Sequence, residues 1–361
     1  MNRLPGSPEV EEDPTRFPSG AEFVETLERY ARVHVLPVVK NVEVLAVEQD
    51  AGTYVLKTSA DIFRSKSLII AAGIQRTPKI PDVAHSLSGA LNLLHTATYR
   101  CPEALEPGAV LVVGSGQSGC QIAEELLEVG RRIYLATSRV GRLPRRYRGR
   151  DTLAWRCDMG FYDQTTESFD ESEPVRAPIP IATGVRGGHT LSLQQFARDG
   201  AVLLGHLERV ADTRFYFAAD LSENVRFGDE FAADTRHMID TYIGLQRIDA
   251  PSAEEDPVET PEPHLGVDPP REIDLRRAGV RTVIWATGFG GDFTWLPARL
   301  LDGNGTPAHT NGIGHNPGLY VLGFPWTSKR KSGIVYGVEE DATRIAAHVT
   351  NARTAPTTAH A

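Results

Sequence analysis

Apolar residues recur along this chain at two spacings, and these divide it into predicted strands and helices. Residues 110–113 form a short continuous apolar run of the kind that makes a buried strand. Just after it, Ile122, Ala123 and Leu126 recur at the spacing of one helix face. Three glycines stand between the run and this face. The pattern predicts a strand, a tight turn and a helix in immediate succession.

The remaining pattern predicts further alternation of strands and helices. Ser19-Gly20-Ala21-Glu22 is a capping box that opens a helix with Phe23, Leu27 and Tyr30 along one face. Strands are expected over residues 33–47, 53–58, 62–70, 201–204, 281–289 and 317–323, and helices over 151–159, 191–198, 221–245 and 333–349. Residues 251–270 contain six prolines and six acidic residues, which indicates a linker or long loop. The expected fold class is α/β.

The three glycines have the spacing G-x-G-x-x-G of a dinucleotide-binding turn. Gly114 permits the turn, Gly116 lets a pyrophosphate approach the backbone, and Gly119 allows close packing of helix and strand. The helix N-terminus then directs free N–H groups at the phosphate. The loop residues expected to bind the nucleotide are Gly114, Ser115, Gly116, Gln117, Ser118 and Gly119. An ordinary glycine turn is the weaker alternative, because strand and helix flank the motif as a nucleotide site requires.

The end of the second predicted strand indicates which dinucleotide is bound. Residues 131–136 form this strand, and Ser138 and Arg139 follow it. An NAD site would carry an acidic residue here for the ribose 2′-hydroxyl, whereas a serine and an arginine suit a 2′-phosphate. NADP is therefore favoured over NAD. Residues 139–150 hold six arginines, which favours phosphate recognition or a solvated loop over a nucleic-acid patch.

Composition excludes several other classes of protein. A chain of 361 residues with 41% hydrophobic content can form two domains, and its net charge of −9 argues against a general nucleic-acid binder. No apolar run is long enough to span a bilayer, so no membrane association is expected. The three cysteines are isolated, which suggests reduced thiols and a cytoplasmic protein. Neither C-x-x-C nor H-E-x-x-H occurs, so no dithiol centre and no zinc site is indicated.

Several motifs together resemble the flavin-containing monooxygenase-like family, which includes Baeyer–Villiger enzymes and plant auxin-forming monooxygenases. They are the glycine loop, the strand end Ala286-Thr287-Gly288-Phe289, and Gly318-Leu319-Tyr320-Val321-Leu322-Gly323. The resemblance covers about residues 4–349. The family's linking fingerprint is matched only loosely, by Leu87-Ser88-Gly89 and by His95 with Tyr99 four residues on.

The resemblance implies two dinucleotide-binding domains of the Rossmann-like, glutathione-reductase-like kind. It assigns residues 108–272 to the NADP-binding domain, with an inserted helical and loop segment, and residues 1–107 and 273–361 to the FAD-binding domain. No G-x-G-x-x-G precedes residue 114, and only eighteen residues precede Ser19. The FAD-binding domain is therefore expected to be truncated, without its first βαβ unit, which would take about 30 residues.

The resemblance also implies which other residues contact the cofactors. Val42, within Asn41-Val42-Glu43, matches the strand edge that meets the adenine of FAD. Ala72 and Gly73 match the first Ala-Thr-Gly turn, and Gly323 matches the segment that closes on the flavin ring. The full set of these implied contacts is Val42, Ala72, Gly73, Ala286, Thr287, Gly288 and Gly323.

In the family, NADPH reduces the flavin, and the reduced flavin then reacts with O₂ and oxygenates a small organic substrate. The cofactor carries this chemistry, so no catalytic residue is assigned. His95 is interpreted as a structural linker histidine, His189 as a structural loop histidine, and Lys329, Arg330 and Lys331 as solvated rather than functional. Two alternatives stay open: a flavin reductase or oxidase that does not oxygenate, and an NADP-binding module without flavin. Neither the substrate nor the oligomeric state follows from the sequence.

Overall fold

The computed structural model describes residue 4 and residues 16–87, 91–168, 180–262, 265 and 268–354, which fall into two units. Unit 1 comprises Met1–Thr77, Gly160–Val175 and Gly290–Ala361, and unit 2 comprises Pro78–Met159 and Arg176–Phe289. The short strands β5 (Thr77–Pro78) and β16 (Phe289–Gly290) lie where the chain passes from one unit to the other.

These units divide the chain at other places than the expected boundaries at residues 107/108 and 272/273. The physical reason lies in two strands on either side of the expected domain. Strands β6 (Asn92–His95) and β15 (Val280–Trp285) are hydrogen-bonded in parallel to each other, and β15 pairs with the strand that precedes the glycine loop. Strand pairing therefore brings both into unit 2.

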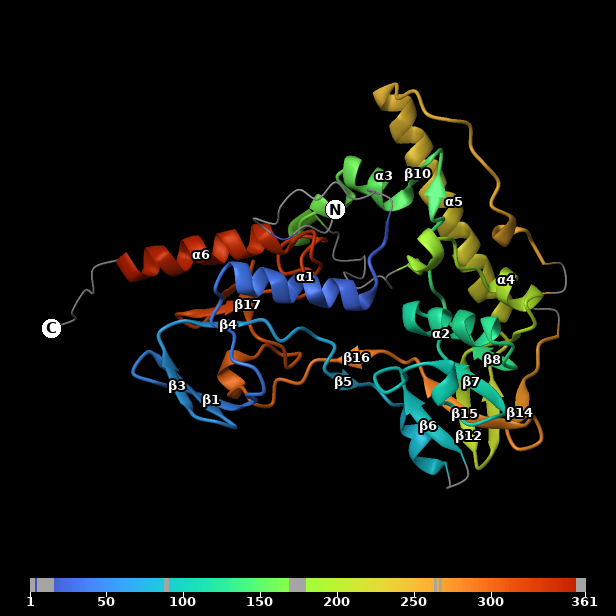
Figure 1. Cartoon of the computed structure of the whole chain (residues 1–361), viewed down its shortest axis with the longest axis horizontal. Helices are drawn as coiled ribbons and strands as arrows, with labels where there is room; N and C mark the ends of the chain where they lie inside the picture. Colours follow the sequence, from blue (N-terminus) through green and yellow to red (C-terminus); the bar gives the residue numbers. More distant parts are fainter. Residues whose placement is uncertain are drawn as a thin grey trace. The chain divides into compact units, whose positions relative to one another are not determined.

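A parallel sheet of five strands forms the centre of unit 2, in the order β11-β8-β7-β15-β6 (Figure 1). Strand β7 (Ala109–Val113) is in the middle, next to β8 (Ile133–Ala136), and β11 (Val202–Leu204) is at one edge. Parallel strands of this kind are buried on both faces, which explains the continuous apolar run predicted here. All five residues of β7 are buried.

Side chains of β7 alternate between two hydrophobic clusters, one on each face of the sheet. Val110 and Val112 pack with residues of α2 (Gln117–Glu128) and α4 (Leu193–Arg198). Leu111 and Val113 pack instead with β13 (Arg214–Phe217) and β14 (Glu272–Asp274). These last two strands form an antiparallel sheet with β12 (Leu207–Ala211). Unit 2 thus has three layers, with the glycine loop at the carboxyl end of its central strand.

A smaller cluster of Tyr147, Trp155 and Ile239 joins α3 (Thr152–Asp158) to the long helix α5 (Leu221–Gln246). The short pair β9 (Arg146–Tyr147) and β10 (Arg150–Asp151) precedes α3. Single 3-10 turns complete the unit at η1 (Asp82–Ser86), η2 (Pro102–Ala104), η5 (Val185–Gly187) and η6 (Pro257–Glu259).

The described residues of unit 1 form two sheets. Strands β1 (Val44–Asp50), β2 (Thr53–Thr58) and β3 (Ile62–Ser65) form an antiparallel meander. The second sheet has the order β17-β18-β19-β4, with β4 (Leu68–Ile70) and β19 (Leu319–Val321) parallel. Strands β17 (His309–Thr310) and β18 (Ile313–Gly314) are antiparallel to their neighbours. One core, which includes Tyr54, Ile70 and Val321, joins the two sheets.

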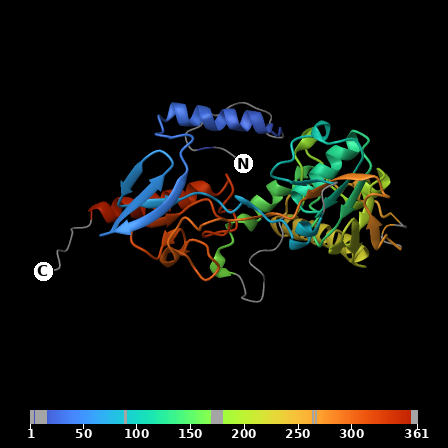
Figure 2. The ribbon, with the colours of Figure 1, turned by 90° about the horizontal axis from the view of Figure 1, so that it is seen from below.

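The helices of unit 1 are α1 (Gly20–Val33) and α6 (Val338–Thr354), with 3-10 turns η3 (Phe161–Asp163), η4 (Thr166–Ser168) and η7 (Ala298–Leu300). The capping box predicted for α1 is present, because the Glu22 N–H donates to Ser19 and the Glu22 carboxylate accepts from the Ser19 N–H. However, no residue of α1 is buried, and Figure 2 shows the helix standing apart from the strands of its unit. The helix predicted with Phe23, Leu27 and Tyr30 along one face is thus present, but that face is not buried.

The expected strand over residues 33–47 is also largely wrong. Only its last part is extended and paired, as β1 from Val44, while Val35, Val38 and Val39 lie outside any strand and are exposed. The α/β fold class is confirmed, as are the strands at residues 53–58 and 201–204 and the helices at residues 151–159, 191–198 and 221–245.

Candidate functional site

The glycine loop joins the end of β7 at Val113 to the start of α2 at Gln117. Gly114 has φ +108°, a conformation that favours glycine, and a β-carbon there would lie 2.6 Å from the carbonyl oxygen of Ala286. Gly116 is the N-cap of α2 and provides no side-chain hydrogen bond to the first turn. A β-carbon on Gly116 would have no atom within 4 Å. The space above the first turn of α2 is therefore open to a ligand.

Gly119 lies under this loop and has no room for a side chain. A β-carbon there would lie 1.9 Å from the carbonyl oxygen of Gly114 and 3.2 Å from the β-carbon of Ala286. Ala286 also donates its N–H to the Val113 carbonyl at 2.8 Å, which continues the pairing of β15 with β7. The three glycines thus take the positions that a dinucleotide turn requires: a sharp turn, an open approach and a close packing contact.

The other loop side chains are held by hydrogen bonds. The Ser115 hydroxyl accepts from the Ser138 N–H at 2.9 Å, which ties the glycine loop to the end of β8. Gln117 accepts from the Ala182 N–H at 2.9 Å and also donates to the Ala182 carbonyl. Cys120, in the first turn of α2, is completely buried, and burial raises the pKa of its thiol to about 12. These hydrogen bonds join the glycine loop to the end of β8 and to the segment at Ala182.

Arg139 extends from the end of β8 into solvent. Its Nη2 donates to Oε2 of Glu223 in the first turn of α5 at 2.9 Å, and both side chains are more than half exposed. A cavity of about 20 Å³ lies beside Ser115 and Ser138, with Arg142 and Asn224 also in its wall. The sequence predicts Ser138 and Arg139 at this site but gives no sign of Glu223 and Asn224, which the structure places beside them. No sequence signal could have found them, because α5 begins more than 80 residues further along the chain.

Thr287 and Gly288, which follow β15, also lie at the carboxyl end of the sheet of unit 2. Thr287 donates its hydroxyl to the Lys79 carbonyl, and the Gly288 carbonyl accepts from the Lys79 N–H at 3.0 Å. His95 is buried, with Nε2 3.0 Å from the Gly288 carbonyl oxygen and Nδ1 accepting from the Ala97 N–H at 3.1 Å. Nδ1 must therefore be unprotonated, and burial lowers the pKa of His95. Both ring nitrogens of this imidazole are hydrogen-bonded, which agrees with the interpretation of His95 as a structural histidine.

His189 lies on the outer side of α2 rather than at the glycine loop. It pairs with Glu124 through Nε2, and its Nδ1 is 3.2 Å from the Val185 carbonyl oxygen. Both residues line a cavity of about 610 Å³ formed by α2, α4 and the loop before α4. This cavity is the larger of the two, but the glycine loop does not line it.

In unit 1, the residues expected to contact FAD lie at two strand ends and on one exposed loop. Ala72 and Gly73 follow the carboxyl end of β4, and Gly323 follows that of β19. The two ends are adjacent, since the Leu322 N–H donates to the Ile70 carbonyl at 2.9 Å. Gly73 and Gly323 have φ +66° and +77°, and β-carbons on either would have no atom within 4 Å. Val42 precedes β1 and is half-buried. Ser88 and Gly89 of the linking fingerprint lie outside the described residues.

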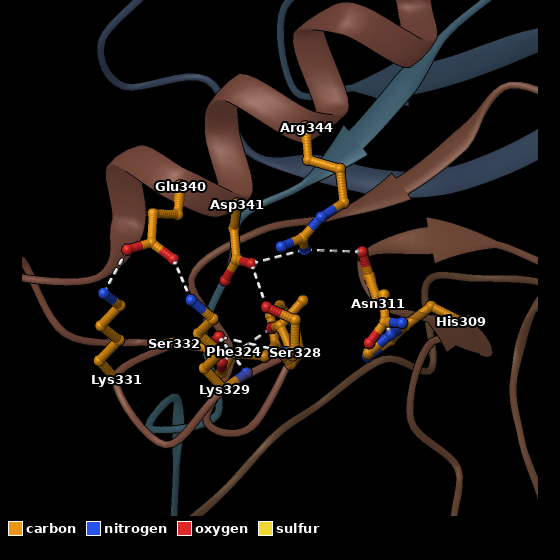
Figure 3. Close-up of polar contacts among 12 residues, drawn as sticks. His309, Asn311, Phe324, Ser328, Lys329, Lys331, Ser332, Glu340, Asp341 and Arg344 are labelled. Carbon is orange, nitrogen blue, oxygen red and sulfur yellow. Dashed lines mark hydrogen bonds and ion pairs between the residues drawn. The ribbon is translucent and has the colours of Figure 1, made fainter. Parts of the chain in front are cut away.

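The turn before α6 carries a cluster of paired charges, of which Lys331 and Asp341 are buried (Figure 3). Glu340 accepts hydrogen bonds from Lys329 and Lys331, and Lys331 also lies 2.7 Å from Asp163. Burial disfavours the charge of Lys331, but its two carboxylate partners raise its pKa above the ordinary value. Lys331 is only 6% exposed. The interpretation of Lys331 as a solvated lysine is therefore wrong, because its side chain is buried and paired with the partly exposed carboxylates of Asp163 and Glu340.

Asp341 stands at the centre of the same cluster. The Ser328 hydroxyl donates to its Oδ1 at 2.6 Å, and Arg344 donates to the same oxygen at 2.9 Å (Figure 3). Arg344 also lies 3.4 Å from the Asn311 carbonyl oxygen. These contacts fix the turn that begins after Gly323 against the first turn of α6.

Comparison with known proteins agrees with this geometry. The sequence profile of the family described as pyridine nucleotide-disulphide oxidoreductase matches residues 4–150. The chain is 28% identical to an "uncharacterized oxidoreductase CzcO-like" of Geobacillus kaustophilus, over 95% of this chain and 81% of that protein. It is 29% identical to a probable indole-3-pyruvate monooxygenase, YUCCA4, of Arabidopsis thaliana, over 31% of this chain and 28% of that protein.

A solved structure shares the fold. The flavin-containing monooxygenase from Stenotrophomonas maltophilia superposes with a TM-score of 0.61 at 17% identity, covering 97% of this chain and 82% of that one. The match to the pyridine nucleotide-disulphide oxidoreductase family and the oxidoreductase relatives support an oxidoreductase, and the solved structure shows the fold that it shares. Its sequence is similar to the flavin-containing monooxygenase-like proteins, which supports FAD and NADP(H) as its cofactors. In the part of the chain that the structure describes, no helix is both long and apolar enough to cross a membrane.

Proposed function

We propose that this chain is an NADPH- and FAD-dependent monooxygenase that transfers one oxygen atom from O₂ to a small organic substrate. The observation that carries the proposal is the glycine loop at the end of the central strand of unit 2. There Gly116 leaves the approach to the first turn of α2 open, and Gly119 brings the helix against the strand. An anion at this turn would meet backbone N–H groups that have no side-chain cap.

The residues of unit 2 provide binding and orientation for NADPH. Gly114, Ser115, Gly116, Gln117, Ser118 and Gly119 form the cradle for the pyrophosphate. Ser138 and Arg139 lie at the end of β8, where the ribose of a dinucleotide is bound in such folds, and Arg139 is free to turn towards a 2′-phosphate because it is 66% exposed. Ala286, Thr287 and Gly288 form the neighbouring rim, with Ala286 packed under the loop.

The residues of unit 1 suit the flavin. Ala72, Gly73 and Gly323 follow two adjacent parallel strands, at the side of an α/β sheet where ligands are bound. The open space at both glycines lets a flat ring system approach the backbone, and Val42 offers a backbone edge before β1. When bound, FAD supplies the redox chemistry, accepting hydride from NADPH and passing electrons to O₂. The protein's part is to position the two cofactors and to exclude water.

Titration with FAD and NADPH tests this function directly. Purified protein mixed with FAD and freed of excess by gel filtration is expected to keep a yellow flavin absorbance, and NADPH under anaerobic conditions is expected to bleach it. With air and candidate small nucleophiles or ketones, one oxygenated product should form per NADPH consumed. Hydrogen peroxide alone would favour a reductase or oxidase, and NADPH binding without retained flavin would favour the nucleotide-binding module. Both results contradict the monooxygenase proposal. We further propose that the protein works in the cytoplasm.

A further inference from the structure

The end of β8 carries no acidic residue, but a carboxylate reaches the same place from another element. The residues that follow β8 are Thr137, Ser138 and Arg139, so the sequence there offers no carboxylate for a ribose 2′-hydroxyl. Glu223, in the first turn of α5, places its Oε2 2.9 Å from Nη2 of Arg139. A carboxylate at the end of the second strand is the group that selects NAD in this kind of fold. Here it stands beside the arginine that suits NADP.

The position of Glu223 is fixed by its buried neighbour. Asn224 is 1% exposed, and its Nδ2 donates to the Thr137 hydroxyl at 3.1 Å. That hydroxyl in turn donates to the Leu204 carbonyl at 2.7 Å, at the end of β11. The first turn of α5 is thereby fastened to the end of β8. Because this anchor is buried, Glu223 stays beside Arg139 even though its own side chain is exposed.

The charges of the pair favour different nucleotides. To bind a 2′-phosphate, Arg139 must leave Glu223. The phosphate and the Glu223 carboxylate are then two anions close together, and their repulsion weakens the binding of NADPH. A 2′-hydroxyl carries no charge and can donate its hydrogen bond to Glu223 while the Arg139–Glu223 pair stays closed. The Arg139–Glu223 pair can therefore bind either ribose. Arg139 binds the 2′-phosphate of NADPH, and Glu223 accepts a hydrogen bond from the 2′-hydroxyl of NADH.

We propose that Glu223 is a specificity-determining residue that lets this site take NADH as well as NADPH. The inference rests on the proposed nucleotide site at the glycine loop and refines it. It assigns to α5 the role that an acidic residue on the second strand has in NAD-selective folds. Removing the carboxylate should convert the site to one that prefers NADPH more strongly.

The test measures dissociation constants of NADPH and NADH for the whole chain by calorimetric titration at fixed ionic strength. Glu223→Gln should tighten NADPH about three- to fivefold, because one exposed charge is removed, and weaken NADH by a similar factor, because the 2′-hydroxyl then donates to a neutral acceptor instead of a charged one. Arg139→Ala should weaken NADPH about tenfold or more, since it removes a charge-assisted bond, and should leave NADH nearly unchanged. Glu230→Gln is the matched control, because Glu230 lies on the same helix, is 64% exposed, and pairs with Arg226 rather than Arg139.

The outcomes separate this inference from the proposed function. Equal changes of both nucleotides in Glu223→Gln, or no change in either, with normal binding by the unaltered protein, would overturn the role of Glu223 and leave the glycine loop as the site. A change in Glu230→Gln as large as in Glu223→Gln would also overturn it, because general charge would then be the cause. Failure of the unaltered protein to bind either nucleotide would overturn both proposals. Glu223→Asp, which keeps the charge, should resemble the unaltered protein more closely than Glu223→Gln in its affinity for NADPH.

Discussion

Two glycines of the same loop are expected to respond differently to alanine, because their surroundings differ. At Gly119, an added β-carbon would lie 1.9 Å from the Gly114 carbonyl oxygen, whereas ordinary contact begins at 3.4 Å. The helix must therefore move by about 1.5 Å. At Gly116, the same carbon would meet no atom within 4 Å, and φ is −70°, which alanine adopts without strain.

The structure gives the size of each effect on stability. Overpacking of about 1–3 kcal/mol at Gly119 is partly offset by the better helix propensity of alanine, about 1 kcal/mol, so Gly119→Ala should lose up to about 2 kcal/mol. At Gly116, a weaker N-cap and a less flexible unfolded chain oppose each other, and the change should stay within about 0.5 kcal/mol.

NADPH binding should fall in both variants. In Gly116→Ala, the methyl group occupies the approach of the pyrophosphate and costs one or more charge-assisted hydrogen bonds, about ten- to hundredfold in affinity. In Gly119→Ala, the displaced helix turns its first N–H groups away from the ligand. Gly244→Ala is the control, since Gly244 lies on α5 with no atom within 4 Å of an added β-carbon. It should keep full affinity and equal or higher stability.

Urea unfolding and calorimetric titration of the three variants measure both quantities. If Gly116→Ala bound NADPH as tightly as the unaltered protein, the loop would not be the pyrophosphate site. If Gly119→Ala were as stable as Gly244→Ala, the packing of α2 on Ala286 would be incorrect.

Two further predictions concern pH. The folded protein holds His95 neutral with its pKa lowered from 6.5, so the unfolded chain binds more protons and the free energy of unfolding should fall as pH drops below 6.5. In His95→Gln, the urea midpoint should change less with pH over this range. An identical pH dependence in both proteins would contradict the assignment of a neutral imidazole. For Glu340, burial raises the pKa, but the hydrogen bonds from Lys329 and Lys331 prevail and hold the pKa below 4.5. This carboxylate therefore stabilises the fold above pH 4.5 and loses that effect as pH falls further. Between pH 5 and pH 3, the urea midpoint of Glu340→Gln should therefore fall less than that of the unaltered protein. An equal fall would show that the hydrogen bonds from Lys329 and Lys331 do not lower the pKa of Glu340.

The parts of the fold that could be predicted from sequence are those fixed by neighbours in the chain. The turn from β7 to α2 is specified by four apolar residues and three glycines within ten positions, so its geometry follows from local rules. The helix α5 likewise follows from its own periodicity. Glu223 shows the limit, because its place beside Arg139 depends on the buried contact of Asn224 with Thr137. That contact joins residues 87 positions apart, and local pattern contains no information about it.

Lys331 shows the same limit for charge. In sequence, Lys329-Arg330-Lys331 is typical of a solvated loop, and an unpaired lysine in the interior would be unfavourable by several kcal/mol. Asp163, which lies 168 positions earlier in the chain, offsets this cost because its carboxylate is 2.7 Å from Nζ of Lys331. The Lys331 side chain can then be buried, although Ile334 in the same turn stays exposed. Whether a charged residue is solvated was thus decided by a partner that the local sequence could not indicate.

Unit 1 shows the opposite case, in which correct local patterns do not lead to burial. The helix α1 forms where its capping box predicts, yet within the described residues none of its side chains is buried. Val35, Val38 and Val39 have strong β propensity and still form no ladder there. Periodicity predicts which face of an element is apolar, but burial requires a second surface, and strand pairing requires a second backbone edge. In unit 2 the central β7 has a strand on each side and a hydrophobic cluster on each face, and there every element of the predicted strand, turn and helix is realised.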